Sequence, residues 1–253
     1  MNGAGNKVSM QFSAVLWKEW VQFKSKWISI SLSALVGPLL YLTAFGWGLG
    51  GAVSVNGAGY IAFIIPGIIA MNAMTNGFGV IANDINLSRN YMKTFEAVMI
   101  APVGMAVYTI ARVTANTLRS LYGAALIIGA SFLFQTSAAL AIDGYFVLVL
   151  ILNGYVFSLI GFIAGILITS HPDMAKVSSF VITPMSFLCG TFFPLEKFPV
   201  PLRIIFEALP LTQAVKGLRM GFTAPGSLIA PLILSAYVIV LLPLAIRLCG
   251  RAE

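Results

Sequence analysis

The sequence predicts an all-α integral membrane protein with an N-terminal interfacial amphipathic helix, six transmembrane helices, and a re-entrant pair of short helices between spans five and six. Hydrophobic residues make up 59% of the 253 residues and charged residues only 9%, which is more apolar surface than a soluble domain of this size can bury. Long stretches also lack any charge, and about 20 apolar residues are enough to cross a bilayer. We expect residues 1–253 to form a single transmembrane domain.

Residues 9–27 form the predicted interfacial helix. Its apolar face carries Phe12, Leu16, Trp20, Phe23 and Trp27, and polar residues cover the other face. A helix of this kind lies in the plane of the membrane surface. Two compatible interpretations stay open: the helix is a membrane-surface anchor, or it is a lever that couples a cytoplasmic partner to the first span.

The predicted spans follow from uncharged intervals of sufficient length. No charged residue occurs between Trp27 and Asn83, which leaves room for two spans on either side of a glycine-rich break. Later uncharged intervals accommodate four more. The predicted spans are residues 28–50, 60–82, 106–134, 144–169, 177–194 and 226–247.

Two spans contain local features with structural consequences. In the fourth span, Gly154, Ser158, Gly161 and Gly165 share one helical face. A stripe of small residues lets neighbouring helices approach closely, so close packing is expected there. In the fifth span, Pro184 predicts a kink.

Residues 195–222 are predicted to form the two re-entrant helices, each too short to span. Pro194 is expected to end the fifth span, and the amphipathic stretch from Pro201 to Leu209 precedes a second stretch after Pro210. Backbone groups at membrane depth must be bonded or buried in protein, so the apolar face of the first helix should pack on the bundle. The alternative is a pair of interfacial helices without a gating role. The predicted outer gate consists of Phe193, Pro194, Leu202, Phe206 and Leu209.

The loop after the second span is predicted to hold a short helix within residues 88–102, with Ser88 as its N-cap. Apolar residues on one face of this helix favour a docking site for another protein, and the alternative is a helix that lies on the lipid surface. The predicted docking residues are Tyr91, Met92, Phe95, Glu96, Met99 and Pro102.

The net charge of +7 sorts by membrane side, so it does not predict nucleic-acid binding. Nine basic residues fall in segments that are cytoplasmic if the N-terminus is cytoplasmic, and four fall outside. Cytoplasmic loops are enriched in Lys and Arg, so both termini are predicted to be cytoplasmic. Residues 1–27 lack the short apolar core of a cleavable signal peptide.

Polar side chains within the spans mark a possible substrate path. Arg112 and Arg119 share a face of the third span, where they either snorkel toward the cytoplasmic surface or form a track for an anionic head group such as a phosphate. Asn72 and Asn76 lie on the second span, where interhelical hydrogen bonding and substrate lining are both open.

Motifs for chemistry are not found. The sequence has no phosphate-binding GxxxxGK[ST] loop, and no carboxylate falls in the middle of a predicted span. The single histidine, His171, is expected in a solvated turn, and Cys189 and Cys249 are too far apart in predicted depth to pair. The chain is therefore not expected to be an enzyme, to bind a metal or cofactor, or to be an ion-coupled carrier.

The stretches FEAVMIAPVG and TPMSFLCGTFFPLEKFPVPLRIIFEALPLTQAVKGLR, together with the predicted layout, resemble the permease subunit of ABC-2 type exporters. The likeness extends over nearly the whole chain. Within that family the sequence is similar to export permeases for nodulation lipo-oligosaccharides, polysaccharides and daunorubicin-type drugs.

The resemblance implies a bacterial inner-membrane (plasma-membrane) protein that exports an amphipathic or lipid-linked substrate. It further implies a homodimer in contact with membrane lipid and bound to two ATPase subunits, which hold the ATP and magnesium. The stretch from Tyr91 to Pro102 would then be the coupling helix. A secondary transporter or channel, or a membrane-embedded enzyme or assembly factor, are the alternatives, and the sequence does not rank the possible substrates.

Overall fold

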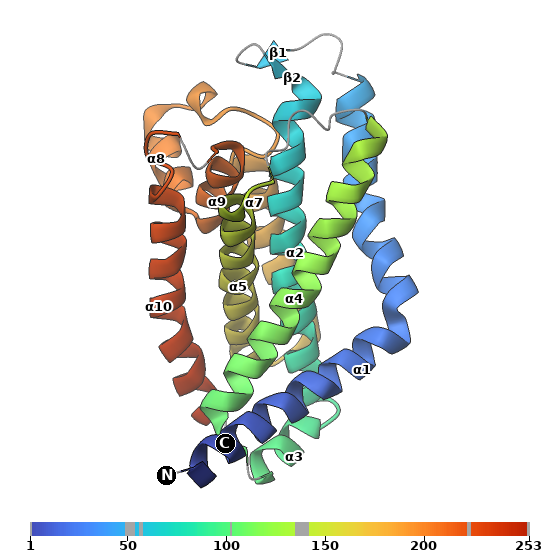
Figure 1. Cartoon of the computed structure of the whole chain (residues 1–253), viewed down its shortest axis with the longest axis vertical. Coiled ribbons are helices and arrows are strands. Elements are labelled where there is room, and N and C mark those ends of the chain that lie inside the picture. Colours follow the sequence, from blue (N-terminus) through green and yellow to red (C-terminus); the bar gives the residue numbers. More distant parts are fainter. Residues whose placement is uncertain are drawn as a thin grey trace.

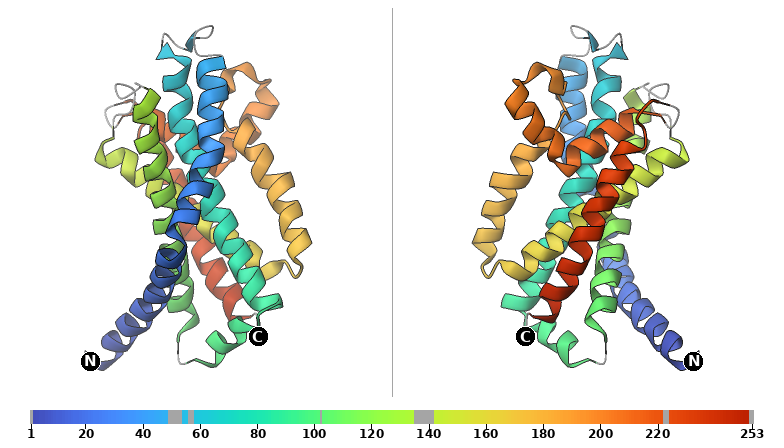
Figure 2. Two further views of the ribbon diagram at one scale, coloured as in Figure 1. Left: turned by 90° about the vertical axis from the view of Figure 1, so that its right-hand side faces the viewer. Right: turned by 90° about the vertical axis from the view of Figure 1, so that its left-hand side faces the viewer.

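The computed structural model describes residues 2–48, 54–55, 58–101, 103–134, 142–221 and 224–251. These residues form a bundle of helices, with both chain ends at the same end of the molecule (Figures 1 and 2). The longest helices are α1 (Asn2–Tyr41), α2 (Tyr60–Asn90), α4 (Met105–Ser131), α5 (Gly144–Leu167) and α10 (Ile229–Gly250). The fold class is therefore helical as predicted. The exception is a short antiparallel hairpin in the glycine-rich break, which consists of β1 (Ser54–Val55) and β2 (Ala58–Gly59) with two residues each.

Four helices within the described residues are long and apolar enough to cross a membrane: Lys7–Phe45, α2, α5 and α10. The predicted third span corresponds to α4, whose 27 residues reach roughly 40 Å at 1.5 Å per residue. The predicted fifth span corresponds to three consecutive helical segments. These are α6 (His171–Val177), the π-helical turn η4 (Ser178–Ile182) and α7 (Thr183–Leu188).

Helix α1 bends at Lys26, whose backbone is not helical (φ −124°, ψ 15°). The bend lies next to the boundary at residue 27 that separates the predicted interfacial helix from the first span. In Figure 2 the N-terminal part of α1 leaves the bundle at an angle, whereas the later part runs beside α2 and α4. The segment ends in the π-helical turn η1 (Leu42–Trp47).

The packing between α2 and α5 confirms the small-residue stripe. A Cβ atom on Gly161 would lie 2.5 Å from the carbonyl oxygen of Phe78, and one on Gly165 would lie 2.8 Å from the Cβ of Ile85. Such distances leave no room for a side chain. Amide groups add to this contact, because Asn153 of α5 donates to the carbonyl of Ala70 of α2 (3.0 Å).

The helical segment from α6 to α7, which corresponds to the predicted fifth span, begins and ends earlier than predicted. Ser170 caps α6 by accepting a hydrogen bond from the backbone N–H of Asp173, so His171 starts a helix and is not in a turn. The helix ends near Gly190, which adopts a positive φ of 82°, and not at Pro194. Pro184 has no N–H to donate four residues back, and the chain forms the wider turn η4 just before it.

Two short helices, α8 (Val200–Ala208) and α9 (Pro210–Arg219), follow the 3-10 turn η5 (Leu195–Lys197). The prediction that the apolar face of α8 packs on the bundle is wrong. Leu202 and Ile205 are exposed and α8 has no buried residue, whereas Leu211, Ala214 and Val215 of α9 are buried. Only Leu209, between the helices, packs against the core.

One ion pair, from Lys216 to Glu207, and two hydrogen bonds to carbonyls at the end of α8 connect this helix to α9 and α10 without burying its apolar face. Glu207 of α8 accepts from Lys216 of α9 and from Arg203, both at 3.0 Å. These two hydrogen bonds, that from Lys216 first, lower the pKa of the Glu207 carboxyl. The apolar face of α8 is therefore free to contact lipid or another chain.

The loop after the second span also differs from its prediction. Helix α2 continues to Asn90, and Ser88 is inside it, with its hydroxyl bonded to the carbonyl of Ile85. Lys93 then takes a left-handed conformation (φ 53°), which separates α2 from α3 (Thr94–Ile100). The predicted helix over 88–102 is thus reduced to seven residues, and Pro102 lies outside the described residues.

Candidate functional site: a buried ion triad, a docking helix and a polar groove

Arg112 of α4 forms ion pairs with Glu19 of α1 and Asp84 of α2. Its side chain is 4% exposed, that of Glu19 20%, and that of Asp84 48%. A buried guanidinium is costly unless its donors are satisfied, and its planar fork suits two carboxylates. Neither prediction for Arg112 is therefore correct: it neither snorkels nor presents a free charge to an anionic head group.

Arg119, two turns further along α4, is partly buried and lies within electrostatic reach of Glu19 and Asp84. Among the described residues it forms no ion pair of its own. A second contact holds α1 on this side of α4, since the rings of Phe23 and Tyr122 meet edge to face at 5.1 Å and the Tyr122 hydroxyl bonds to Ser31 (2.7 Å). The sequence placed both arginines on one face but gave no indication of these partners.

Helix α3 is seated on the bundle by Phe95, at the end of the molecule that holds both termini (Figure 1). Phe95 is 3% exposed and packs edge to face on Tyr108 of α4, with ring centroids 6.2 Å apart. Tyr108 lies one turn before Arg112. The predicted docking residue Phe95 therefore points inward, and among the described side chains of α3 it is the one that is buried.

Other side chains near α3 are available to a partner. Tyr91 and Met92, which precede the helix, are 56% and 61% exposed, and Ile100 at its end is 87% exposed. Glu96 is also exposed. The side chain of Met99 is not among those described. The exposed Ile100, which the sequence did not single out, adds to this surface.

A groove of about 250 Å3 lies between α1, α2 and α7. Asn72 donates to the carbonyl of Ala34 of α1 (3.0 Å), and Asn76 donates to the side-chain oxygen of Asn72 (2.9 Å). Asn72 thus makes the interhelical bond and both amides also line the groove. The lining residues are Ser33, Gly37, Pro38, Tyr41, Met71, Asn72, Thr75, Asn76, Thr183, Ser186 and Phe187.

Aromatic rings gather at the end of this groove that is nearer to η1. Phe192 is fully buried and its ring lies 5.3 Å from those of Tyr41 and Phe187 and 4.9 Å from that of Phe45. The hydroxyl of Tyr60 donates to the carbonyl of Phe192 (3.0 Å). The predicted gate residue Phe193, by contrast, is 46% exposed, because consecutive residues of this bend point in different directions.

Arg219 connects α9 to α2 and to the bend after α7. Its guanidinium lies 3.7 Å from the centre of the Phe63 ring, and it donates to the carbonyls of Phe63 (3.1 Å) and Thr191 (3.0 Å). Its partners are backbone carbonyls, which no residue pattern identifies in advance.

Within the described part of the chain, no group of three or more His, Cys, Asp or Glu residues could hold a metal ion. Cys189 and Cys249 are both free and buried.

These features define a multi-pass helical membrane protein. The ABC-2 type transporter family model matches residues 10–223, and the chain belongs to this family. Membership implies the transport subunit of an exporter, which works with an ATPase subunit.

Two relatives show the extent of the similarity. The Inner membrane transport permease YadH of Escherichia coli (strain K12) is 27% identical over 206 residues, which cover 81% of this chain and 80% of YadH. Nodulation protein J of Rhizobium meliloti (strain 1021) is 30% identical over 207 residues, or 79% and 78% of the two chains.

Arg219→Gln should destabilise the protein by about 2 kcal/mol, since it removes charged hydrogen bonds to two buried carbonyls and the contact with the Phe63 ring. Thermal unfolding in detergent measures the loss. Lys216→Gln, three residues earlier in α9, removes an equal charge from a surface ion pair and should cost less than about 1 kcal/mol. Equal losses in the two variants would show that Arg219 is not a structural tie.

Proposed function

We propose that the chain is the transmembrane permease subunit of an ATP-driven exporter in the bacterial inner membrane. Its substrate is an amphipathic or lipid-linked molecule, such as a lipo-oligosaccharide, a polysaccharide or a drug. The observation that carries the proposal is the groove between α1, α2 and α7, because hydroxyl and amide groups line it although the surrounding helices are apolar. Family membership and relatives named as a transport permease and a nodulation protein support it.

In this proposal the chain crosses the membrane six times, with α4 and α6–α7 as the third and fifth spans and both termini in the cytoplasm. The common end of the termini in Figure 1 fits an even number of spans, and α3 lies at that end. A second copy of the chain would cover the exposed residues Phe180 and Val181 of η4 and close the open side of the groove.

The ATPase subunits, two per homodimer, would carry the ATP and magnesium and dock at α3. Exposed apolar side chains on a surface loop suit a protein partner, and those of Met92 and Ile100 fulfil this condition. Phe95 would act from inside by transmitting the position of α3 to Tyr108. The seal of the path would lie at the aromatic rings of Tyr41, Phe187 and Phe192, with α8 and α9 as a cover on the outer side.

Ile100→Asp should prevent the ATPase subunit from co-purifying with this chain, because it places a charge at the most exposed of the apolar positions described in α3. Val200→Asp is the matched control, since Val200 is 69% exposed at the start of α8 at the opposite end of the molecule. Co-purification from membranes and ATP hydrolysis by the complex are measured. Normal recovery of the ATPase with Ile100→Asp would exclude this docking surface.

The double variant Thr75→Val and Thr183→Val should slow ATP-dependent transport, because it removes two hydroxyl groups from the groove. Each hydroxyl that contacts substrate contributes about 1 kcal/mol, so its loss should lower the transport rate roughly fivefold. Valine keeps the shape of threonine, so the fold is retained. Thr43→Val is the control, because Thr43 of η1 is not part of the groove lining. Uptake of a lipid-linked oligosaccharide, a polysaccharide and an amphipathic drug into inverted vesicles is compared, and unchanged transport of every transported class would reject the groove as the path.

A further inference from the structure

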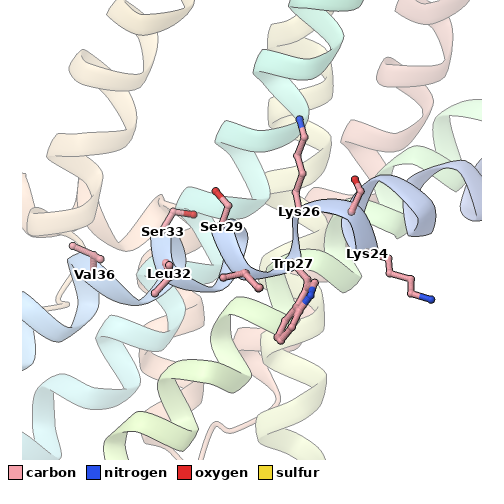
Figure 3. Close-up of a pocket in the computed structure, with 9 residues that line it drawn as sticks. Lys24, Lys26, Trp27, Ser29, Leu32, Ser33 and Val36 are labelled. Atoms are coloured by element: carbon pink, nitrogen blue, oxygen red, sulfur yellow. The ribbon is translucent and has the colours of Figure 1, made fainter.

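The bend of α1 creates a second and larger hollow of about 690 Å3 on the surface of the bundle (Figure 3). Residues from both sides of the bend line it, and all of them belong to α1. The lining consists of Lys24, Ser25, Lys26, Trp27, Ile28, Ser29, Leu32, Ser33 and Val36. In Figure 3 the side chains of Lys26, Ser29 and Ser33 project on the same side of the helix, and Trp27 projects from the opposite side.

The charge of this hollow is positive and lacks compensation from the protein. Two ammonium groups and three hydroxyl groups line it, and no carboxylate does. Glu19, the nearest acidic residue along α1, is engaged by Arg112. In the described ranges neither Lys24 nor Lys26 has an ion-pair partner, so the hollow suits an anion.

The hollow also has the dimensions of one membrane leaflet. Ten residues separate Lys26 from Val36, which corresponds to about 15 Å along a helix, or half of a hydrocarbon core of about 30 Å. Lys26 and Trp27 mark the end at the level of the head groups, where tryptophan is enriched. Ile28, Leu32 and Val36 continue from there along the helix, and the last two are 61% and 57% exposed.

We propose that this hollow binds one anionic phospholipid from the leaflet on the side of the chain termini. The ammonium group of Lys26 binds its phosphate, the hydroxyl group of Ser29 on the same side of the helix donates to a head-group oxygen, and Lys24 adds positive charge at the edge of the hollow. One acyl chain lies against Ile28, Leu32 and Val36. Because Ser33 also lines the groove between α1, α2 and α7, the bound lipid borders that groove and supports the bend that opens it.

The test measures lipid binding to the purified full-length chain in detergent, with phosphatidylglycerol and phosphatidylcholine as probes. Native mass spectrometry counts the lipid retained at increasing lipid concentration. The natural chain should retain one phosphatidylglycerol in preference to phosphatidylcholine. The double variant Lys24→Gln and Lys26→Gln should weaken phosphatidylglycerol binding roughly thirtyfold, since each lysine near an anionic lipid contributes roughly fivefold.

The double variant Lys7→Gln and Lys18→Gln is the matched control. It removes the same charge from exposed positions of the same helix outside the hollow, and it should bind phosphatidylglycerol like the natural chain. Equal weakening in both double variants, or no preference for phosphatidylglycerol in the natural chain, would overturn the proposal. Complete disulfide cross-linking of the variant Leu32→Cys between two copies of the chain in membranes would also overturn the proposal. In that case the face of α1 that carries Leu32 would be an interface between two copies and not a lipid site.

Discussion

The contact of Arg112 with Glu19 and Asp84 determines where the N-terminal part of α1 lies. A guanidinium in the interior of a membrane bundle costs several kcal/mol unless carboxylates or other acceptors satisfy it. The two carboxylates come from α1 and α2, so both helices must approach α4 at one point. The triad therefore stabilises one particular arrangement of α1, α2 and α4.

Other features of the bundle depend on this arrangement. Tyr108, one turn before Arg112, packs against Phe95 of α3, so α3 and the triad share one helix as their support. Beyond the triad, α1 bends at Lys26 and then passes α2, where Asn72 bonds to Ala34. A displacement of α3 would act on α4 and, through Glu19, on the part of α1 that precedes the groove. In the proposed function, this sequence of contacts is the route by which an ATPase subunit at α3 influences the groove.

The sequence predicted the structural features that depend on local properties of the chain. Uncharged intervals located α4, α5 and α10 to within about three residues at each end, but α2 runs eight residues beyond its predicted end. The small residues of α5 predicted its tight packing on α2, which Gly161 and Gly165 confirm. These properties follow from the length of an apolar run or from the size of one side chain. The boundary near residue 27 was likewise predictable, because amphipathic and purely apolar stretches meet there.

The remaining errors concern choices that only tertiary contacts decide. Amphipathicity alone could not tell that α9 is buried while the apolar face of α8 is exposed, since both helices have an apolar side. Phe95 belonged to the expected outer face, but a short helix needs an inward anchor. Arg112 looked like a free charge because its partners are 93 and 28 residues away. No spacing rule connects such distant positions.

A double-mutant cycle between Arg112 and Glu19 tests the central role of the triad most directly. The free energy of unfolding in detergent is measured for the natural chain, Arg112→Met, Glu19→Met and the double variant. If the two side chains form the contact that positions α1, the losses should deviate from additivity by at least about 1 kcal/mol, since Glu19→Met removes little once Arg112 is gone. Additive losses to within about 0.5 kcal/mol would contradict the account, because α1 would then be held on the bundle by its other contacts.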